Sequence, residues 1–92
     1  MRTEQVEIYS DSTNAAVLRH PGRKFPGILI QGDTLHVWCL RLDELCRTAR
    51  PHLAEDAYAE LNKVRNGLWD KLNHYKLVLA EHDLPLPFSE RP

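Results

Sequence analysis

Hydrophobic and polar residues alternate along the first part of the chain. Between Glu4 and Ser10, Val6 and Ile8 fall on one side of an extended backbone, whereas Glu7 and Tyr9 fall on the other. This period of two, built from β-branched and aromatic residues, predicts a half-buried strand.

Two further short strands are expected before residue 32. Residues 15–19 fit a strand, although their alanines leave a single helical turn as an alternative, and the apolar run at residues 28–31 fits a buried strand. The intervening segments contain Pro-Gly pairs, which favour loops. Because these connections are too short for parallel crossovers, the pattern predicts an antiparallel sheet of two or three strands within about residues 4–31.

The period changes at Gly32-Asp33. From there apolar residues recur at steps of three and four, which predicts a helix over about residues 34–49 that ends at Arg50-Pro51. Asp33 or Thr34 is expected to cap its first turn. The apolar positions are Leu35, Trp38, Cys39, Leu42, Leu45, Cys46 and Ala49. They cover an arc of about 120°, so all seven are expected to face the core.

A second and longer apolar stripe predicts a helix over about residues 53–82, antiparallel to the first, with an extended tail over residues 84–92. Its core positions are Ala57, Leu61, Val64, Leu68, Leu72, Tyr75 and Leu79. As one piece the helix would measure about 45 Å, longer than the roughly 30 Å expected for a domain of this size. It therefore either breaks at Asn66-Gly67 or overhangs. The unbroken stripe favours continuity, and an overhang suggests a homodimer.

Composition narrows the class of protein. The 92 residues, 42% of them hydrophobic, predict one α+β domain over residues 1–92. Twelve basic and thirteen acidic residues give a net charge of −1, which argues against nucleic-acid or anionic-membrane partners. No apolar run approaches the ~20 residues of a membrane span, and the first residues lack a secretory signal pattern. The expected location is the cytoplasm.

The candidate metal ligands are His36, Cys39, Cys46 and His52, and the two cysteines are also the candidate nucleophiles. No Cys-x-x-Cys pair is present, and both cysteines fall on the apolar side of their helix, where thiols usually act as small hydrophobic groups. The two cysteines lie about 10 Å apart along a helix axis, too far for a disulfide. We therefore predict no metal, no cofactor and no enzymatic activity.

A ridge beside the core stripe of the second helix is the first candidate for binding. It consists of Tyr58, Asn62, Arg65, Trp69, Asn73 and Lys76. Tyr, Trp and Arg are enriched at the energetic centres of protein interfaces, so Tyr58, Arg65 and Trp69 are predicted to contact a partner or a second copy. The alternative is that Tyr58 and Trp69 only widen the core face.

The N-terminal third resembles a family of small uncharacterised bacterial proteins. The residues that carry the resemblance are Val6–Ser10, Thr13–Val17, Pro21–Gly27 and Ile30–Leu35. The family is classed as a domain of unknown function, so the resemblance implies bacterial origin and a compact domain but no reaction or ligand. Within these motifs Arg23 and Gln31 have no evident structural role. A second candidate site is expected where the loop that carries Arg23 would meet Asn14 and Gln31.

Two functions from different classes follow. The first is a non-enzymatic protein-binding module whose partner is another protein or a second copy; by analogy with small bacterial proteins its narrower form is a toxin-neutralising immunity protein. The second is a small enzyme or ligand-binding protein that uses Arg23, Gln31, Asp33 and His36 at the strand–helix junction. A deep polar pocket at the junction would favour the second, and a flat apolar ridge over Tyr58 and Trp69 the first.

Overall fold

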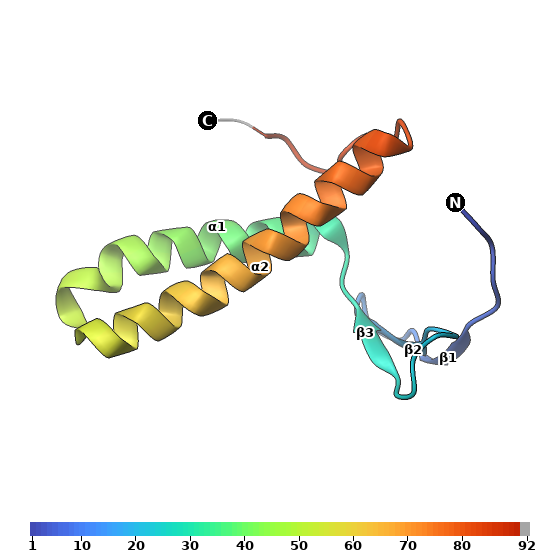
Figure 1. The fold of residues 1–92 in the computed structure, drawn as a ribbon, viewed down its shortest axis with the longest axis horizontal. Coiled ribbons are helices and arrows are strands. Elements are labelled where there is room, and N and C mark those ends of the chain that lie inside the picture. The colour runs from blue at the N-terminus through green and yellow to red at the C-terminus, as the bar shows by residue number, and fades with distance from the viewer. Residues whose placement is uncertain (91–92) are drawn as a thin grey trace. The chain divides into compact units, whose positions relative to one another are not determined.

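The computed structural model describes residues 1–90 and has three strands followed by two helices (Figure 1). The predicted α+β arrangement is therefore confirmed. The chain divides into two compact units, one over Met1–Gln31 and one that begins at Gly32. The first contains the strands and the second the helices. The single domain expected from the length stays a prediction.

The sheet consists of β1 (Glu7–Ser10), β2 (Ala16–Arg19) and β3 (Gly27–Leu29), all antiparallel, in the order β1-β2-β3. Residues 16–19 thus form a strand and not a helical turn. The first and third strands are shorter than predicted. Because β2 ends at Arg19, opposite Glu7, the residues before Glu7 have no strand beside them. Ile30 and Gln31 likewise lie beyond the last pair of β3.

One ion pair joins β1 to β2. Glu7 and Arg19 lie directly opposite each other, and Arg19 Nε donates a hydrogen bond to Glu7 Oε1. That hydrogen bond, together with the guanidinium charge, lowers the pKa of Glu7. A lowered carboxyl pKa means that the pair stabilises the fold above the unfolded-state value and is lost as the pH falls through the folded-state value. Both side chains are exposed to water, so the contribution is small.

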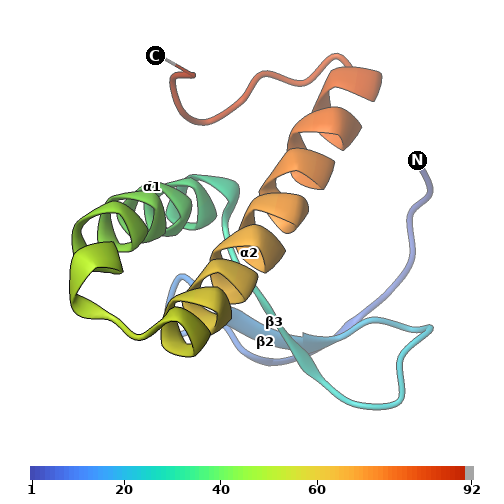
Figure 2. The ribbon, with the colours of Figure 1, turned by 60° about the vertical axis from the view of Figure 1, so that its left-hand side comes forward.

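The helices form an antiparallel hairpin of α1 (Gly32–Ala49) and α2 (Glu55–Glu81), joined by the short 3₁₀ helix η1 (Arg50–His52) (Figure 2). The first helix begins two residues earlier than predicted, but Asp33 accepts an amide hydrogen of the first turn, as expected. Helix α1 already begins at Gly32, so Asp33 and Thr34 lie inside its first turn, where Asp33 Oδ1 accepts a hydrogen bond of 2.9 Å from the Thr34 amide. A carboxylate in the first turn interacts favourably with the positive end of the helix dipole.

Helix α2 runs without interruption through Asn66-Gly67, so the possible break does not occur. Its 27 residues extend about 40 Å. The helix ends in a Schellman motif: the Leu84 amide donates to Leu79 O at 2.9 Å and the Asp83 amide to Ala80 O at 3.2 Å. Asp83 adopts φ 56°, the left-handed conformation that this motif requires.

The buried seam of the hairpin is narrower than the sequence predicts. Cys39 and Leu72 are fully buried and Cys46 nearly so, whereas Trp38 is 41% exposed, Leu45 49% and Val64 57%. The prediction that these last three residues, and Ala57, lie in the core was wrong. Each helix packs against one other helix, which covers only part of its apolar stripe. Trp38 and Leu45 lie at one edge of the 120° arc of α1, and Val64 lies at one edge of the narrower stripe of α2. The rest of each apolar stripe stays at the surface.

The N-terminus of α1 passes very close to α2. A Cβ built on Gly32 would lie 2.2 Å from Tyr75 Cζ and 2.4 Å from Tyr75 Oη, distances at which the ring has to move. Gly32 is buried and Tyr75 partly so. Glycine at position 32 therefore lets the Tyr75 ring close this end of the seam.

The replacement Gly32→Ala is expected to lower the free energy of unfolding by about 1 to 3 kcal/mol, because it overpacks the seam. Chemical denaturation followed by circular dichroism measures this change. The matched control is Gly67→Ala in the middle of α2, where a Cβ meets nothing within 4 Å. This control should raise stability by up to about 1 kcal/mol through helix propensity. If Gly67→Ala lowered the stability and Gly32→Ala left it unchanged, the close approach of Gly32 to Tyr75 would be contradicted.

The two thiols of the seam are expected to be inert in the folded protein. Burial raises the pKa of Cys39, which keeps the thiol protonated, and only the thiolate reacts. A thiol reagent such as DTNB should modify neither Cys39 nor Cys46 under native conditions and both in denaturant. Rapid modification of the native protein at neutral pH would show that the seam is open.

Candidate functional site

One carboxylate organises the polar side of the hairpin. Asp43 Oδ1 on α1 accepts a hydrogen bond of 2.5 Å from Arg65 Nε and one of 2.9 Å from Trp69 Nε1, both on α2. Arg65 and Trp69 are four residues apart and therefore lie on one side of their helix. Two of the predicted binding residues thus meet at a residue that the sequence analysis did not single out.

The position of Asp43 explains why it needs these partners. It follows Cys39 by four residues and precedes Cys46 by three, so it lies along the edge of the buried seam. A partly buried carboxylate is costly unless donors surround it. Two signals in the sequence could have identified Asp43. It is an acidic residue spaced three and four residues from apolar core positions, and Arg65 is a cation at the corresponding level of the antiparallel helix.

Charge and aromatic contacts extend the site along α2. The hydrogen bond from Arg65 to Asp43 and the charge of that carboxylate raise the pKa of Arg65. Lys76 Nζ lies 5.8 Å from the centre of the Trp69 ring, and the Arg50 guanidinium lies 5.1 Å from the centre of the Tyr58 ring. Both distances are within the range of cation–π attraction.

Two shallow hollows flank the Asp43–Arg65 pair. One, of about 440 Å³, is lined by Asp43, Arg65, Asn66, Trp69, Asp70 and Asn73. The other, of about 320 Å³, is lined by Asp43, Cys46, Arg47, Arg50, Tyr58, Asn62 and Arg65. Their linings mix both signs of charge with amides, an arrangement suited to hydrogen bonding with a polar surface. Within residues 1–90, no three His, Cys, Asp or Glu side chains gather as metal ligands would.

The remaining predicted site residues lie elsewhere. Arg23 is exposed in the loop between β2 and β3, and Gln31 is exposed after β3, both in the first unit. Asp33 is exposed in the first turn of α1 and belongs to the second unit. The binding roles predicted for these three residues and for Tyr58, Arg65 and Trp69 stay predictions.

The C-terminal segment docks on the polar side of the hairpin. The His36 ring stacks on the Phe88 ring with centroids 4.0 Å apart and planes inclined by 8°, and Lys76 Nζ lies 2.7 Å from Glu90 Oε1. Leu86 and Phe88 are partly buried, in agreement with the expectation that they attach the tail to the body. His36 is thereby occupied by an aromatic contact within the chain.

The opposite side of the hairpin is apolar. On α1, Trp38 and Leu45 lie about 140° and 160° around the axis from Asp43. On α2, Val64 lies about 100° from Arg65 and 140° from Trp69, so it is turned to the same side. We call this surface the apolar hairpin face; it consists of Trp38, Leu42, Leu45, Leu61, Val64 and Leu68. The exposed residues of this face are Trp38, Leu45 and Val64.

Comparisons with known proteins give a family but no function. A family model described as "Family of unknown function (DUF6959)" matches residues 1–88. A search of curated proteins and a search of solved structures each found no match. Among the described residues, neither helix combines the length and the apolar content needed to cross a bilayer.

Removal of the central carboxylate is expected to loosen the hairpin. Asp43→Ala leaves the Trp69 indole and the Arg65 guanidinium without their acceptor, at a cost of about 1 kcal/mol in the free energy of unfolding. Denaturant titration measures it. The matched control is the neighbouring Glu44→Gln, which breaks only an exposed pair with Arg47 and should cost less than about 0.5 kcal/mol. Equal effects of the two variants would show that Asp43 has no special role.

Proposed function

The chain belongs to a family of unknown function (DUF6959), and from that premise we propose that it is a non-enzymatic protein-binding module of the bacterial cytoplasm. The observation that carries the proposal is the apolar hairpin face. This face keeps large side chains in water at positions whose spacing is typical of a protein core. Such a patch on a helical hairpin is typical of a surface that another protein covers.

The energetics favour burial of this face. Covering apolar surface gains roughly 25 cal/mol per Å², so the exposed parts of Trp38, Leu45 and Val64 together represent a few kcal/mol. Tryptophan is also among the residues that most often dominate binding energy. The Asp43–Arg65–Trp69 cluster supports the same function indirectly, because it holds the two helices together and so keeps the apolar face in shape.

A second copy of the chain is the partner that we place first. Two identical apolar faces are complementary to each other under two-fold symmetry, which is the commonest arrangement of oligomers. Two hairpins joined in this way would form a four-helix arrangement in which the wide stripes of both chains are covered. A toxin that the module neutralises is the narrower alternative partner, supported by analogy alone.

The ligand-binding or enzymatic alternative has less support. It requires Arg23, Gln31, Asp33 and His36 to act together at the strand–helix junction. His36 is stacked against Phe88, and Asp33 is not part of the lining of either hollow beside Asp43. The protein-binding function uses side chains that are exposed on the hairpin.

The apolar hairpin face can be tested with two leucines of equal exposure on one helix. Leu45→Ser should weaken self-association at least tenfold in sedimentation equilibrium, because each copy loses part of a buried leucine and a symmetric dimer loses it twice. Leu40→Ser is the matched control: Leu40 and Leu45 are both 49% exposed, but Leu40 lies about 140° away around α1.

Two outcomes would count against this proposal. A wild-type chain that stays monomeric at every concentration would remove the second copy as partner. Equal weakening by Leu45→Ser and Leu40→Ser, with unchanged circular dichroism, would show that the apolar hairpin face is not the binding surface.

A further inference from the structure

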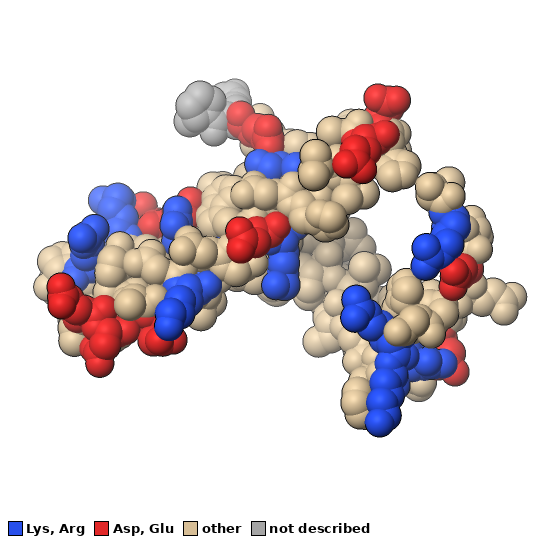
Figure 3. Space-filling model, viewed as in Figure 1, with Lys and Arg blue, Asp and Glu red and all other residues tan. Residues whose placement is uncertain are grey.

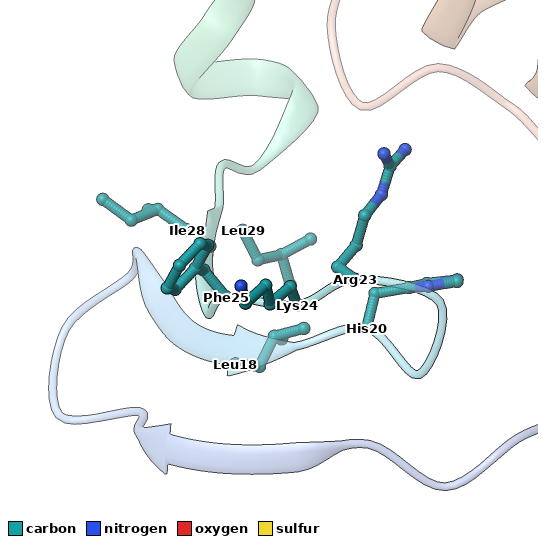
Figure 4. A pocket seen from close by; sticks show the side chains of 8 residues that line it. Leu18, His20, Arg23, Lys24, Phe25, Ile28 and Leu29 are labelled. Carbon is teal, nitrogen blue, oxygen red and sulfur yellow. The ribbon is translucent and has the colours of Figure 1, made fainter.

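The first unit carries a separate hollow that the proposed function does not use. It measures about 490 Å³ and is lined by Leu18, His20, Arg23, Lys24, Phe25, Gly27, Ile28 and Leu29 (Figure 4). Its floor is apolar, and its rim includes two cationic side chains. Phe25, Ile28 and Leu29 are exposed at this hollow.

A glycine creates the hollow. Gly27 of β3 pairs directly with Leu18 of β2, and directly opposed residues point to the same side of a sheet. Leu29, two residues along β3, lies on that side as well. Position 27 therefore leaves a vacant side-chain place beside Leu18 and Leu29, and a Cβ built there meets nothing within 4 Å.

The rim of the hollow is held in shape by its own hydrogen bonds. The Arg23 amide donates to His20 O at 2.9 Å, and the Gly22 amide donates to His20 Nδ1 at 3.0 Å. Arg19 Nη1 donates to Arg23 O at 3.0 Å, while Nε of the same guanidinium binds Glu7. Little ordering of this loop is left to be done when a ligand binds, which favours affinity.

The rim also has positive charge without a partner. Within residues 1–90, Arg19 is paired with Glu7, but neither Arg23 nor Lys24 forms an ion pair. Figure 3 shows several basic side chains in the part of the molecule that holds the strands, with acidic groups beside some of them. Lys24 Nζ lies 5.5 Å from the centre of the Phe25 ring, at the border of the apolar floor.

We propose that this hollow binds an extended acidic segment of a partner protein that carries one bulky apolar side chain. The apolar side chain fills the place above Gly27, and flanking carboxylates face Arg23 and Lys24. Strand β3 has a neighbour on one side only, so an extended segment can pair with its free edge. This surface lies in the first unit and does not rest on the apolar hairpin face.

A protein segment fits these observations better than a nucleic acid. The chain has a net charge of −1, and two cations beside an apolar floor do not form the basic stripe that follows a phosphate backbone. An apolar floor instead selects a hydrophobic side chain, and the cations select the charge of its neighbours.

The test uses a fluorescein-labelled peptide, Asp-Glu-Phe-Asp-Glu, in fluorescence anisotropy with the full-length chain. Gly27→Leu should weaken binding at least tenfold, because its side chain occupies the hollow without a clash at Cβ. The double variant Arg23→Gln/Lys24→Gln should weaken it about tenfold and flatten its dependence on salt. Lys63→Gln, which removes an exposed cation on the hairpin, is the control and should bind like wild type.

Peptides distinguish the two parts of the proposed site. Replacing the peptide's phenylalanine by alanine, or its four acidic residues by lysine, should abolish binding in each case. Retention of wild-type affinity by Gly27→Leu, with unchanged circular dichroism, would overturn the proposal. The proposal would also be overturned if the alanine peptide bound as tightly as the phenylalanine peptide, or if a labelled oligothymidine bound more tightly than the peptide. It would be overturned as well if Gly27→Leu without peptide differed from wild type in molecular mass in solution. The last of these would assign the hollow to a second copy.

Discussion

The helical hairpin depends on one narrow seam in which small residues allow close approach. The seam buries Cys39 and Cys46 of α1 and Leu72 of α2, and Gly32 lets the Tyr75 ring cover its end. Larger residues at these positions would push the helices apart, because interiors of proteins are close-packed. The direction of every other side chain of the hairpin follows from this contact, since it fixes the rotation of both helices about their axes.

The two sides of the seam have opposite character. On one side Asp43 receives Arg65 and Trp69, Arg50 covers Tyr58, and the C-terminal segment attaches at His36 and Lys76. Polar groups on that side are largely paired within the chain. On the other side Trp38, Leu45 and Val64 are exposed, which is why the proposed binding surface lies there. Packing has thus separated a polar side held by internal contacts from a largely apolar side with exposed residues.

The first unit presents a comparable division on a smaller scale. Glu7 and Arg19 tie β1 to β2, and Arg19 also holds the loop that carries Arg23. None of the strand residues is buried, so the unit presents its apolar residues around the place left by Gly27. A sheet of three short strands buries little apolar surface of its own and gains little stability from it, so its apolar side chains remain at the surface.

Local pattern determined the elements of this protein, because strand and helix periods need only neighbouring residues. It predicted a sheet of two or three strands, of which the structure has three, together with two helices, an unbroken stripe through Gly67 and two thiols on the apolar side. Tertiary structure decided which part of each stripe is covered. Trp38, Leu45 and Val64 had core spacing, but they lie at the edges of their stripes, which one neighbouring helix does not cover. Tertiary structure also decided the role of Asp43. Its hydrogen-bond donors, Arg65 and Trp69, lie on α2, and the spacing of residues within α1 does not reveal them.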